Sequence, residues 1–348
     1  MAPKRFRNAR FITLGALAAV LLVWAWLWRE IGGGSGQSGA ASRVIIPKGA
    51  SLRMAADSLA AYDVIGSTRL FRVFARLTGA ETDIKPGTYQ FAAGAGYRDV
   101  LDALVTGRGL MATVVIPEGF DVRDIAPVLA KSLRVPEDSV RAAVTDTAWQ
   151  RALDIPVPSL EGYLFPATYT FPEGTSAREA VNAMIERFLD AWKPEWDTRL
   201  KAMSISRHDA ITMASIVEKE ARKAEERPLI SAVYWNRVKK RMRLQADPTV
   251  QYALPQHVER VLYTDLTVES RYNTYKYPGL PPGPIASPGA ASIAAALAPA
   301  DVPYLFFVAR ADGSHAFTET FAQHSRAIAS IKAARRAAGS TARTDREP

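Results

Sequence analysis

Cysteine is absent from the 348-residue sequence, which excludes disulfide bonds, thiolate metal sites and cysteine nucleophiles. The patterns of phosphate-binding loops (G-x-x-x-x-G-K) and of serine hydrolases (G-x-S-x-G) are also absent. The four histidines, His208, His257, His315 and His324, form no H-x-x-x-H pair, so zinc chemistry loses its usual support. We therefore expect no metal and no other cofactor.

Acidic residues are outnumbered, with 35 Asp and Glu against 44 Lys and Arg and a net charge of +9. Such a balance suits an anionic partner, such as nucleic acid, phospholipid headgroups or a cell-wall polymer, and charge alone does not choose among them. Hydrophobic residues make up 48% of the chain, enough for a sizeable core, and the length suggests two domains or one large domain with appendages.

Charged residues are missing from positions 11–28, where all residues except Thr13 and Gly15 are apolar. A bilayer-spanning helix needs about twenty such residues, and the basic residues before them favour a cytoplasmic N-terminus. We predict a basic cytoplasmic stub at 1–10 and a single transmembrane helix at 11–31. The rest of the chain would then lie on the periplasmic side of the inner membrane. A signal peptide cleaved near residues 38–40 is the main alternative, and a buried core helix is a third.

Residues 32–42 are rich in glycine and serine and predict a flexible linker. They contain a G-x-G-x-x-G pattern, but no strand precedes it and no helix follows, so it does not indicate dinucleotide binding. Beyond the linker, the sequence VIIPKGASLRMAADSL at 44–59 recurs as VVIPEGFDVRDIAPVL at 114–129. The repeat predicts two small units, each with a strand, a P-x-G turn and a helix.

The first unit, over 43–110, resembles a LysM module in its I-P-K-G-x-S-L opening, and that family binds N-acetylglucosamine polymers. The second unit would cover 111–158. The alternative is that both units only pack against the rest of the protein. Proline-rich residues 154–158 indicate a boundary before a catalytic domain at 159–333. We expect an α+β protein with an α/β catalytic domain and a disordered tail at 334–348.

Several elements of the catalytic domain follow from periodicity. We expect helices over 177–192, 207–224 and 229–240, an irregular Pro/Gly-rich loop over 277–289 and a strand over 304–309.

Carboxylates, amides and aromatic residues gather in four blocks of this domain, a composition typical of carbohydrate sites. The blocks are L-E-G-Y-L-F-P at 160–166, S-I-V-E-K-E at 215–220, R-L-Q-A-D-P-T at 243–249, and Y-N-T-Y at 272–275 continued by G-L-P-P-G-P-I at 279–285.

Two glutamates compete for the role of an acid. On a helical wheel, Glu218 lies at one edge of the apolar face of its helix and Glu220 at the other. Half-burial at either edge would raise a carboxyl pKa toward neutrality. Exposed ion pairs with neighbouring basic residues are the alternative for both. Periodicity therefore nominates two candidates and does not choose between them.

Together the four blocks resemble the YceG-like endolytic murein transglycosylases, over roughly residues 44–333. The resemblance implies a lyase that cuts peptidoglycan glycan strands and leaves 1,6-anhydro ends, with Glu218 as its acid and base. Ala167 departs from the family pattern, in which an acidic or amide residue is common. The resemblance implies peptidoglycan strands as the partner and no nucleic acid, and peptidoglycan synthases as further partners.

The other block residues are expected to surround Glu218 and bind substrate; they are Glu161, Gln245, Asp247, Asn273 and Tyr275. Alternatively, Glu161 and Asn273 cap turns, and Asp247 caps a helix. Two other functions compete. One is a non-enzymatic, peptidoglycan-binding scaffold of the cell-wall synthesis machinery, and the other is a pyridoxal-phosphate lyase, for which only Lys219 is a candidate Schiff-base residue.

Overall fold

The computed structural model of the chain describes residues 21, 22, 24, 25, 31, 41–92, 95–256, 258 and 260–344. The predicted stub at 1–10, nearly all of the predicted span at 11–31 and most of the linker at 32–42 lie outside these residues. Among the described residues, no helix combines the length and the apolar composition that a membrane crossing requires.

The chain divides into two compact units. The N-terminal unit comprises Met1–Ala112 with Thr170–Thr175, and the C-terminal unit comprises Thr113–Tyr169 with Ser176–Pro348. The division near residue 112 lies close to the expected boundary at 110. The expected second unit over 111–158 groups with the C-terminal unit instead of standing alone, because its helices pack on a later helix, as described below.

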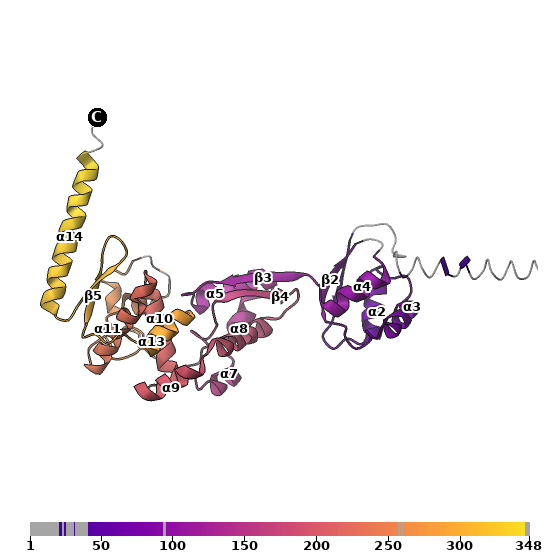
Figure 1. Cartoon of the computed structure of the whole chain (residues 1–348), viewed down its shortest axis with the longest axis horizontal. Coiled ribbons are helices and arrows are strands. Elements are labelled where there is room, and N and C mark those ends of the chain that lie inside the picture. Colours follow the sequence, from indigo (N-terminus) through magenta and orange to yellow (C-terminus); the bar gives the residue numbers. More distant parts are fainter. Residues whose placement is uncertain are drawn as a thin grey trace, which may run out of the picture. The chain divides into compact units, whose positions relative to one another are not determined.

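The N-terminal unit is a two-stranded sheet packed with helices (Figure 1). In chain order its elements are β1 (Ser42–Ile46), α2 (Leu52–Ala61), α3 (Thr68–Leu77), β2 (Gly87–Phe91) and α4 (Tyr97–Thr106). The strands are antiparallel, with Val44 opposite Tyr89. Alternate strand residues point inward, so Val44, Ile46 and Tyr89 join a core completed by the helices. The strand, turn and helix predicted from the first repeat are confirmed.

The C-terminal unit is mainly helical. Its elements in chain order are β3 (Met111–Ile116), α5 (Val122–Leu133), α6 (Glu137–Ala143), α7 (Thr147–Ala152), β4 (Ala167–Pro172), α8 (Ala177–Ala191), α9 (Pro194–Met203), α10 (Arg207–Glu220), η1 (Ala224–Glu226), α11 (Arg227–Lys239), α12 (Asp247–Ala253), η2 (Asp265–Thr267), α13 (Ala290–Leu297), β5 (Phe306–Ala309), β6 (His315–Thr318) and α14 (Phe321–Thr344). Strands β3 and β4 pair, and the division between the units falls within both. Helices α5 and α6 pack on α8.

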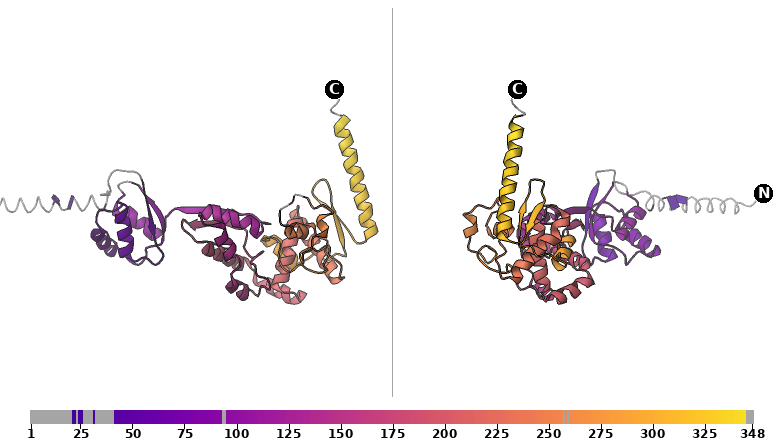
Figure 2. Two further views of the ribbon diagram at one scale, coloured as in Figure 1. Left: turned by 180° about the vertical axis from the view of Figure 1, so that it is seen from behind. Right: turned by 60° about the vertical axis from the view of Figure 1, so that its left-hand side comes forward.

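Helix α10 forms the centre of this unit. Every residue from 210 to 217 is buried, and α10 packs against both α11 and α13 (Figures 1 and 2). Ser206 caps its first turn by accepting a hydrogen bond from the backbone N–H of Asp209. The helix ends at Glu220, four residues earlier than expected, because Ala221 is extended. This turn brings the start of α11 back toward the end of α10.

The segment before β4 begins with a turn instead of extended backbone. Residues 161–163 form a turn, and the strand begins only at Ala167. Gly162 has a φ of +82°, and a Cβ there would lie 2.4 Å from Pro284. Only glycine fits this turn, which carries Glu161 into the interior.

The C-terminal end of the chain also differs from expectation. Strands β5 and β6 form an antiparallel hairpin on which α14 packs, and α14 continues to Thr344. In Figures 1 and 2, this helix starts beside β5 and extends away from the other helices of its unit. The prediction of a disordered tail from Ala334 is therefore wrong up to Thr344. The alanines and arginines of this segment favour a helix, which the absence of an apolar stripe concealed.

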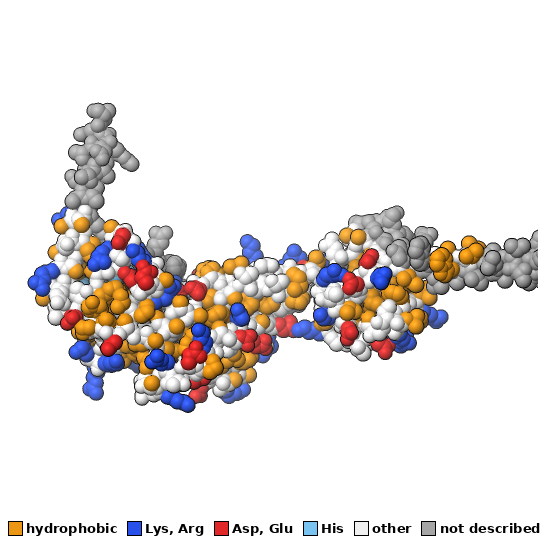
Figure 3. Space-filling view, viewed as in Figure 1, with side chains coloured by type: hydrophobic (Ala, Val, Ile, Leu, Met, Phe, Trp, Pro, Cys, Tyr) orange, Lys and Arg blue, Asp and Glu red, His pale blue; other side chains and the backbone are white. Residues whose placement is uncertain are grey.

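Basic and acidic side chains are interspersed on the face of the C-terminal unit drawn in Figure 3. On that face, the excess of positive charge is not gathered into one patch.

Candidate active site

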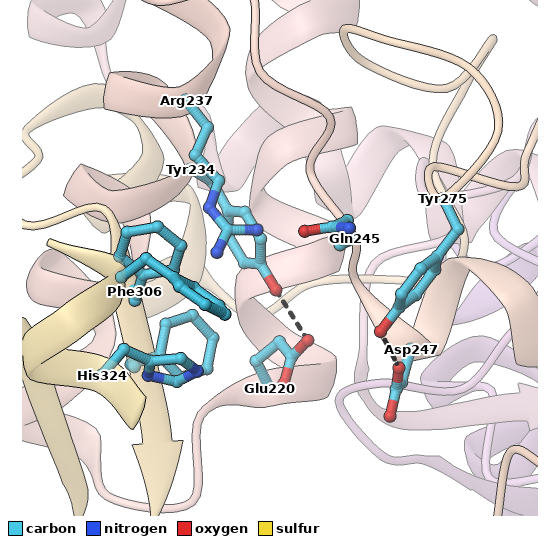
Figure 4. A pocket seen from close by; sticks show the side chains of 10 residues that line it. Glu220, Tyr234, Arg237, Gln245, Asp247, Tyr275, Phe306 and His324 are labelled. Atoms are coloured by element: carbon cyan, nitrogen blue, oxygen red, sulfur yellow. Dashed lines mark hydrogen bonds between the residues drawn. The ribbon is translucent and has the colours of Figure 1, made fainter. Parts of the chain in front are cut away.

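A cavity of about 310 Å³ opens in the C-terminal unit beside the end of α10 (Figure 4). We call it the Glu220 cavity. It is lined by Glu220, Tyr234, Arg237, Gln245, Asp247, Tyr275, Phe306, Phe307, Phe321 and His324. Three of the predicted site residues, Gln245, Asp247 and Tyr275, therefore do come together, but around Glu220 instead of Glu218.

Glu220 is the last residue of α10, and its carboxyl group lies between the walls of the cavity (Figure 4). The phenol of Tyr234, from α11, donates a hydrogen bond of 2.7 Å to its Oε1 atom. Burial raises the pKa of Glu220 to about 7, helped by the negative charge of Asp247 and opposed by the Tyr234 hydrogen bond and by Arg237. A carboxyl with this pKa can both donate and accept a proton near neutral pH.

One wall of the cavity is polar. The phenol of Tyr275 donates a hydrogen bond of 2.6 Å to Oδ1 of Asp247, at the start of α12. Asp247 is the first residue inside this helix, and Ala246 occupies the cap position, so the alternative that Asp247 caps the helix is wrong. Gln245 lies in the left-handed region with a φ of 50°, and its backbone N–H donates to the carbonyl of Thr274. An uncommon conformation of this kind is found often at functional sites.

The opposite wall is aromatic and comes from β5 and the start of α14. It consists of Phe306, Phe307, Phe321 and His324. Arg237 supports it from α11, with its guanidinium carbon 5.2 Å from the centre of the Phe306 ring. The Arg237 side chain is buried and donates hydrogen bonds of 2.7 and 2.6 Å to the carbonyls of Leu305 and Leu244. These bonds fix it between the two walls.

Glu218 occupies different surroundings. Its Oε2 atom accepts a hydrogen bond of 3.0 Å from the backbone N–H of Gly289, and its Oε1 atom lies 3.4 Å from the guanidinium of Arg227. Its side chain is only 7% exposed, and it is not among the residues that line the cavity. Gln245, Asp247 and Tyr275 thus share a cavity with Glu220, whereas Glu218 contacts Arg227 and Gly289. The catalytic role of Glu218 stays a prediction.

Glu118 is a second carboxylate near Glu218, and it was not identified from the sequence. It stands in the P-E-G turn of the second repeat, where the first repeat has Lys48. A Cβ on Gly289 would lie 1.8 Å from its Oε1 atom, so Gly289 must be glycine for this approach. Burial raises the pKa of Glu118, and the charge of Glu218 adds to that effect. Glu118 could have been identified from the sequence, because the otherwise similar first repeat has Lys48 at the same position.

Glu161 is buried away from the cavity lining, beside the start of α5. Its Oε2 atom accepts hydrogen bonds from the backbone N–H of Val122 (3.0 Å) and the phenol of Tyr252 (3.3 Å). Burial raises its pKa to about 8. Glu161 thus joins the start of α5 to α12, which agrees with the alternative of a structural role.

Asn273 is fully buried and stabilises a turn. Its Nδ2 atom donates to the carbonyls of Leu266 and Val268, and its Oδ1 atom accepts from the backbone N–H of Tyr275. Asn273 does not line the cavity, but it holds the backbone of Tyr275, which does. The expectation of direct substrate contact is corrected to that of a support for Tyr275.

The Pro/Gly-rich loop over 277–289 packs against α10 and does not line the cavity. The backbone N–H of Ile285 donates to Ser215, and the carbonyl of Pro282 lies 2.8 Å from Nε2 of His208.

The ring of His315 contacts a carboxylate oxygen of Glu226 at 2.6 Å. Both histidines are therefore held in buried, structural contacts. No group of three or more acidic or histidine side chains within the described ranges is arranged to hold a metal ion.

Comparisons with known proteins identify the family of the chain. Residues 44–330 match the YceG-like family. A Bacillus subtilis protein named endolytic murein transglycosylase is 36% identical over 81% of this chain and 82% of its own length. A Streptococcus pneumoniae protein with the same name is 29% identical over 76% of this chain, which spans only 53% of that relative. The crystal structure of a yceG-like protein from Listeria monocytogenes, 33% identical, superposes with a TM-score of 0.58 over 83% of this chain and 99% of that one. The chain belongs to the YceG-like family.

Proposed function

We propose that the chain is an endolytic peptidoglycan lytic transglycosylase. It would cleave the β-1,4 bond from N-acetylmuramic acid to N-acetylglucosamine within nascent strands, limit their length and leave 1,6-anhydro ends. The observation that carries the proposal is the Glu220 cavity, in which one carboxyl with a pKa of about 7 lies between a polar and an aromatic wall. The names of the curated relatives support the same reaction class.

In the first step, the protonated carboxyl of Glu220 donates its proton to the oxygen of the scissile bond, and that oxygen leaves with the bonding electrons. Positive charge then develops at C1 of the muramyl ring. Asp247 faces the same cavity and its negative charge would stabilise that centre. Arg237 and Tyr234, both fixed by hydrogen bonds, would hold Glu220 in place during proton transfer.

In the second step, the C6 hydroxyl of the same sugar attacks C1 and loses its proton to the Glu220 carboxylate. The enzyme returns to its protonated form, and the product carries a 1,6-anhydro bridge. One carboxyl therefore performs both proton transfers, as the sequence resemblance implied for Glu218. The family resemblance assigns this role to Glu218, and the cavity lining supports Glu220. Both glutamates are hydrogen-bonded to protein groups, so the activities of their Gln variants decide between them.

The test is digestion of purified glycan strands by the full-length chain in detergent, with the products identified by mass spectrometry. Internal fragments with anhydro ends are expected. Reducing ends would indicate that water attacks C1, and the proposal of a lyase would fail. No cleavage at all would favour a non-enzymatic, peptidoglycan-binding scaffold.

We also propose that the enzyme is anchored in the inner membrane through residues 11–31, faces the periplasm and acts beside peptidoglycan synthases. The apolar composition of residues 11–28 and the basic residues before them support this proposal. The N-terminal unit would contribute glycan binding as a LysM-like module, supported by its β1-α2-α3-β2 order and antiparallel strand pair. Membrane fractionation of the full chain and of a form lacking residues 1–31 tests the anchor: both forms in the soluble fraction would refute it.

A further inference from the structure

The hairpin of β5 and β6 carries two of the aromatic side chains that line the Glu220 cavity, Phe306 and Phe307. Both residues belong to β5, which pairs with β6 in a two-stranded sheet. A two-stranded hairpin is marginally stable by itself, so contacts with the rest of the unit must fix its position. The direction of the Phe307 ring therefore depends on the residues that hold the hairpin against the helices.

A buried pair of polar side chains holds the start of β6. Glu226 is the last residue of η1, directly before α11, and His315 is the first residue of β6. The backbone N–H of His315 donates a hydrogen bond of 2.8 Å to Oε1 of Glu226, and the ring Nδ1 atom lies 2.6 Å from Oε2. The side chains of His315 and Glu226 are only 5% and 9% exposed, respectively. One carboxyl group thus fixes both the backbone and the ring of His315.

The His315 ring is linked to Glu220 through two other rings. Phe307 meets His315 edge-on, with ring centres 5.2 Å apart and an interplanar angle of 89°. Tyr234 meets Phe307 in the same way, at 5.7 Å and 88°. The phenol of Tyr234 then donates its hydrogen bond to the carboxyl group of Glu220 (Figure 4). Because closely packed rings cannot shift independently, the orientation of the His315 ring affects that of the Tyr234 phenol.

Stability alone does not account for a polar pair at this place. Burying polar side chains is costly unless they are hydrogen-bonded, and replacing both partners by apolar groups of the same shape can be neutral or even stabilising. Apolar contacts have no direction, whereas the hydrogen bond to the ring nitrogen of His315 fixes how the ring is turned. The pair of Glu226 and His315 is therefore suited to setting an orientation.

We propose that Glu226 and His315 are positioning residues for Glu220. Their hydrogen bonds fix the His315 ring, this ring fixes Phe307, and Phe307 keeps the phenol of Tyr234 directed at the Glu220 carboxyl. The inference rests on the proposed function, in which Glu220 transfers the protons, and it adds the residues that keep Glu220 hydrogen-bonded. Neither Glu226 nor His315 lines the cavity, so they act on the reaction through the intervening rings.

The hydrogen bond from Tyr234 can be followed through the protonation of Glu220. Burial raises the pKa of Glu220 and this hydrogen bond lowers it, so a misdirected phenol should raise the pKa further. The other charged groups that act on Glu220 are Asp247 of α12, Arg237 of α11 and Arg222. Arg237 also donates to the carbonyl of Leu305 beside the hairpin, so its effect has to be separated from that of Tyr234.

An NMR titration of the full-length chain in detergent, labelled at its glutamate carboxyl carbons, measures this pKa directly. The signal missing from the Glu220→Gln protein identifies Glu220. Glu226→Ala removes both contacts to His315 and should raise the titration midpoint of Glu220 by about 0.5 to 1 pH unit, the size expected for one lost hydrogen bond. Tyr234→Phe should raise it by the same amount. The fall in kcat/KM for strand cleavage should move to higher pH in both variants.

Further variants separate this role from a loss of packing, which near-UV circular dichroism monitors. Glu226→Gln keeps an oxygen for the backbone N–H of His315 and an amide for the other tautomer of its ring, so it should retain the wild-type midpoint. Phe307→Leu interrupts the series of rings and leaves no buried polar group unpaired, and it should raise the midpoint as Glu226→Ala does. Asp312→Asn is the control: it weakens an exposed contact of 3.9 Å between Lys223, directly before η1, and the hairpin turn, and should leave the midpoint unchanged.

Double variants test the route. If Glu226 acts through Tyr234, adding Glu226→Ala or Phe307→Leu to Tyr234→Phe should give no further shift. A further shift would indicate a route through Arg237 and would overturn the inference. An unchanged midpoint in Phe307→Leu, in a folded Glu226→Ala protein or in Tyr234→Phe would overturn it as well.

None of these titrations depends on the reaction, because cleavage of glycan strands by the wild-type chain is measured separately. A chain whose Glu220 titrates as expected but that cuts nothing would keep the positioning residues and refute the lyase. Conversely, anhydro-ended products from the wild-type chain together with unchanged midpoints in the variants would keep the lyase and refute the positioning residues.

Discussion

The two glutamates at the end of α10 stand two residues apart but lie in contrasting surroundings. Residues in a helix advance by about 100°, so their side chains diverge by about 200° around its axis. Glu218 is enclosed by Arg227, from α11, and the backbone of Gly289, and the Gly289 contact holds the end of the Pro/Gly-rich loop against α10. Glu220 faces the cavity and accepts a hydrogen bond from Tyr234. A carboxyl whose partners are all supplied by the protein stabilises the fold, whereas one that faces a cavity is available for chemistry.

The largest expected effect separates the two residues by activity. Glu220→Gln removes the proton donor and should lower the initial rate of strand cleavage by about 10²- to 10⁴-fold. Glu218→Gln keeps an oxygen for Gly289 and should lower the rate far less. Fragment release is followed by chromatography, and circular dichroism establishes that both variants fold. The opposite ranking would return the acid role to Glu218, as the motif resemblance implied.

The same comparison should reverse when stability is measured. Glu218→Ala leaves Arg227 and the N–H of Gly289 without their partner, and we expect it to lower the free energy of unfolding by roughly 2–4 kcal/mol. Glu220→Gln relieves a buried carboxylate and should have little effect or stabilise the protein. Glu186→Ala, at an exposed position of α8, is the control, expected within about 0.5 kcal/mol of wild type.

Urea denaturation at pH 7 measures all three variants. If Glu218→Ala is no less stable than Glu186→Ala, the contacts of Glu218 do not stabilise the fold, and the contrast between the two glutamates is lost.

The sequence predicted the elements of the fold better than the orientation of the site. Helices α8 and α11, both strand-turn-helix repeats and the irregular loop followed from periodicity and from Pro and Gly. The early end of α10 did not, because Ala221 has no feature that stops a helix. That end depends on tertiary contacts, such as the ion pair of Arg227 with Glu218.

The candidate site was predicted in part. Gln245, Asp247 and Tyr275 were identified from their motifs and do line the cavity. The aromatic wall was missed because Phe306 and Phe321 resemble ordinary core or surface positions in the sequence. The helical wheel placed Glu218 and Glu220 at the two edges of the apolar face and did not choose between them as the acid. Their surroundings differ only through the packing around α10.

A third glutamate extends the comparison to the interior. The pKa of Glu161 is raised to about 8 in the folded state, above the value of an unfolded chain. Between these two values the folded protein binds one proton more than the unfolded protein. Stability from this group is therefore fully present at low pH and is lost as pH rises, by about 1.4 kcal/mol per pH unit, until Glu161 ionises near pH 8.

Glu161→Gln should remove this contribution, so the variant should lose less stability than wild type between pH 5 and pH 8. Urea midpoints measured across that range test the prediction. Parallel curves for the two proteins would show that Glu161 is ionised throughout, and Glu186→Gln serves as an exposed control.

The smallest expected effects concern the pH dependence of kcat/KM, which follows the protonation of Glu220. The first step needs its protonated form, so kcat/KM should fall as pH rises through about 7. Asp247 raises the pKa of Glu220 and the Tyr234 hydrogen bond lowers it, while Arg237 and Arg222 also favour the charged form. Asp247→Asn should therefore move the fall in kcat/KM to lower pH, and Tyr234→Phe should move it to higher pH. Asn still accepts the Tyr275 hydrogen bond, so the first shift is not caused by a lost contact.

A general loss of structure would lower kcat/KM at every pH. It would not move the pH at which kcat/KM falls downward in one variant and upward in the other. Tyr263→Phe, far more exposed and outside the cavity, should leave the profile unchanged. If Glu218 were the acid instead, these two substitutions should not give opposite shifts, because neither Asp247 nor Tyr234 is among the hydrogen-bond partners of Glu218 that the structure shows, Arg227 and Gly289. The pH profile therefore distinguishes the two glutamates even in variants that retain most of their activity.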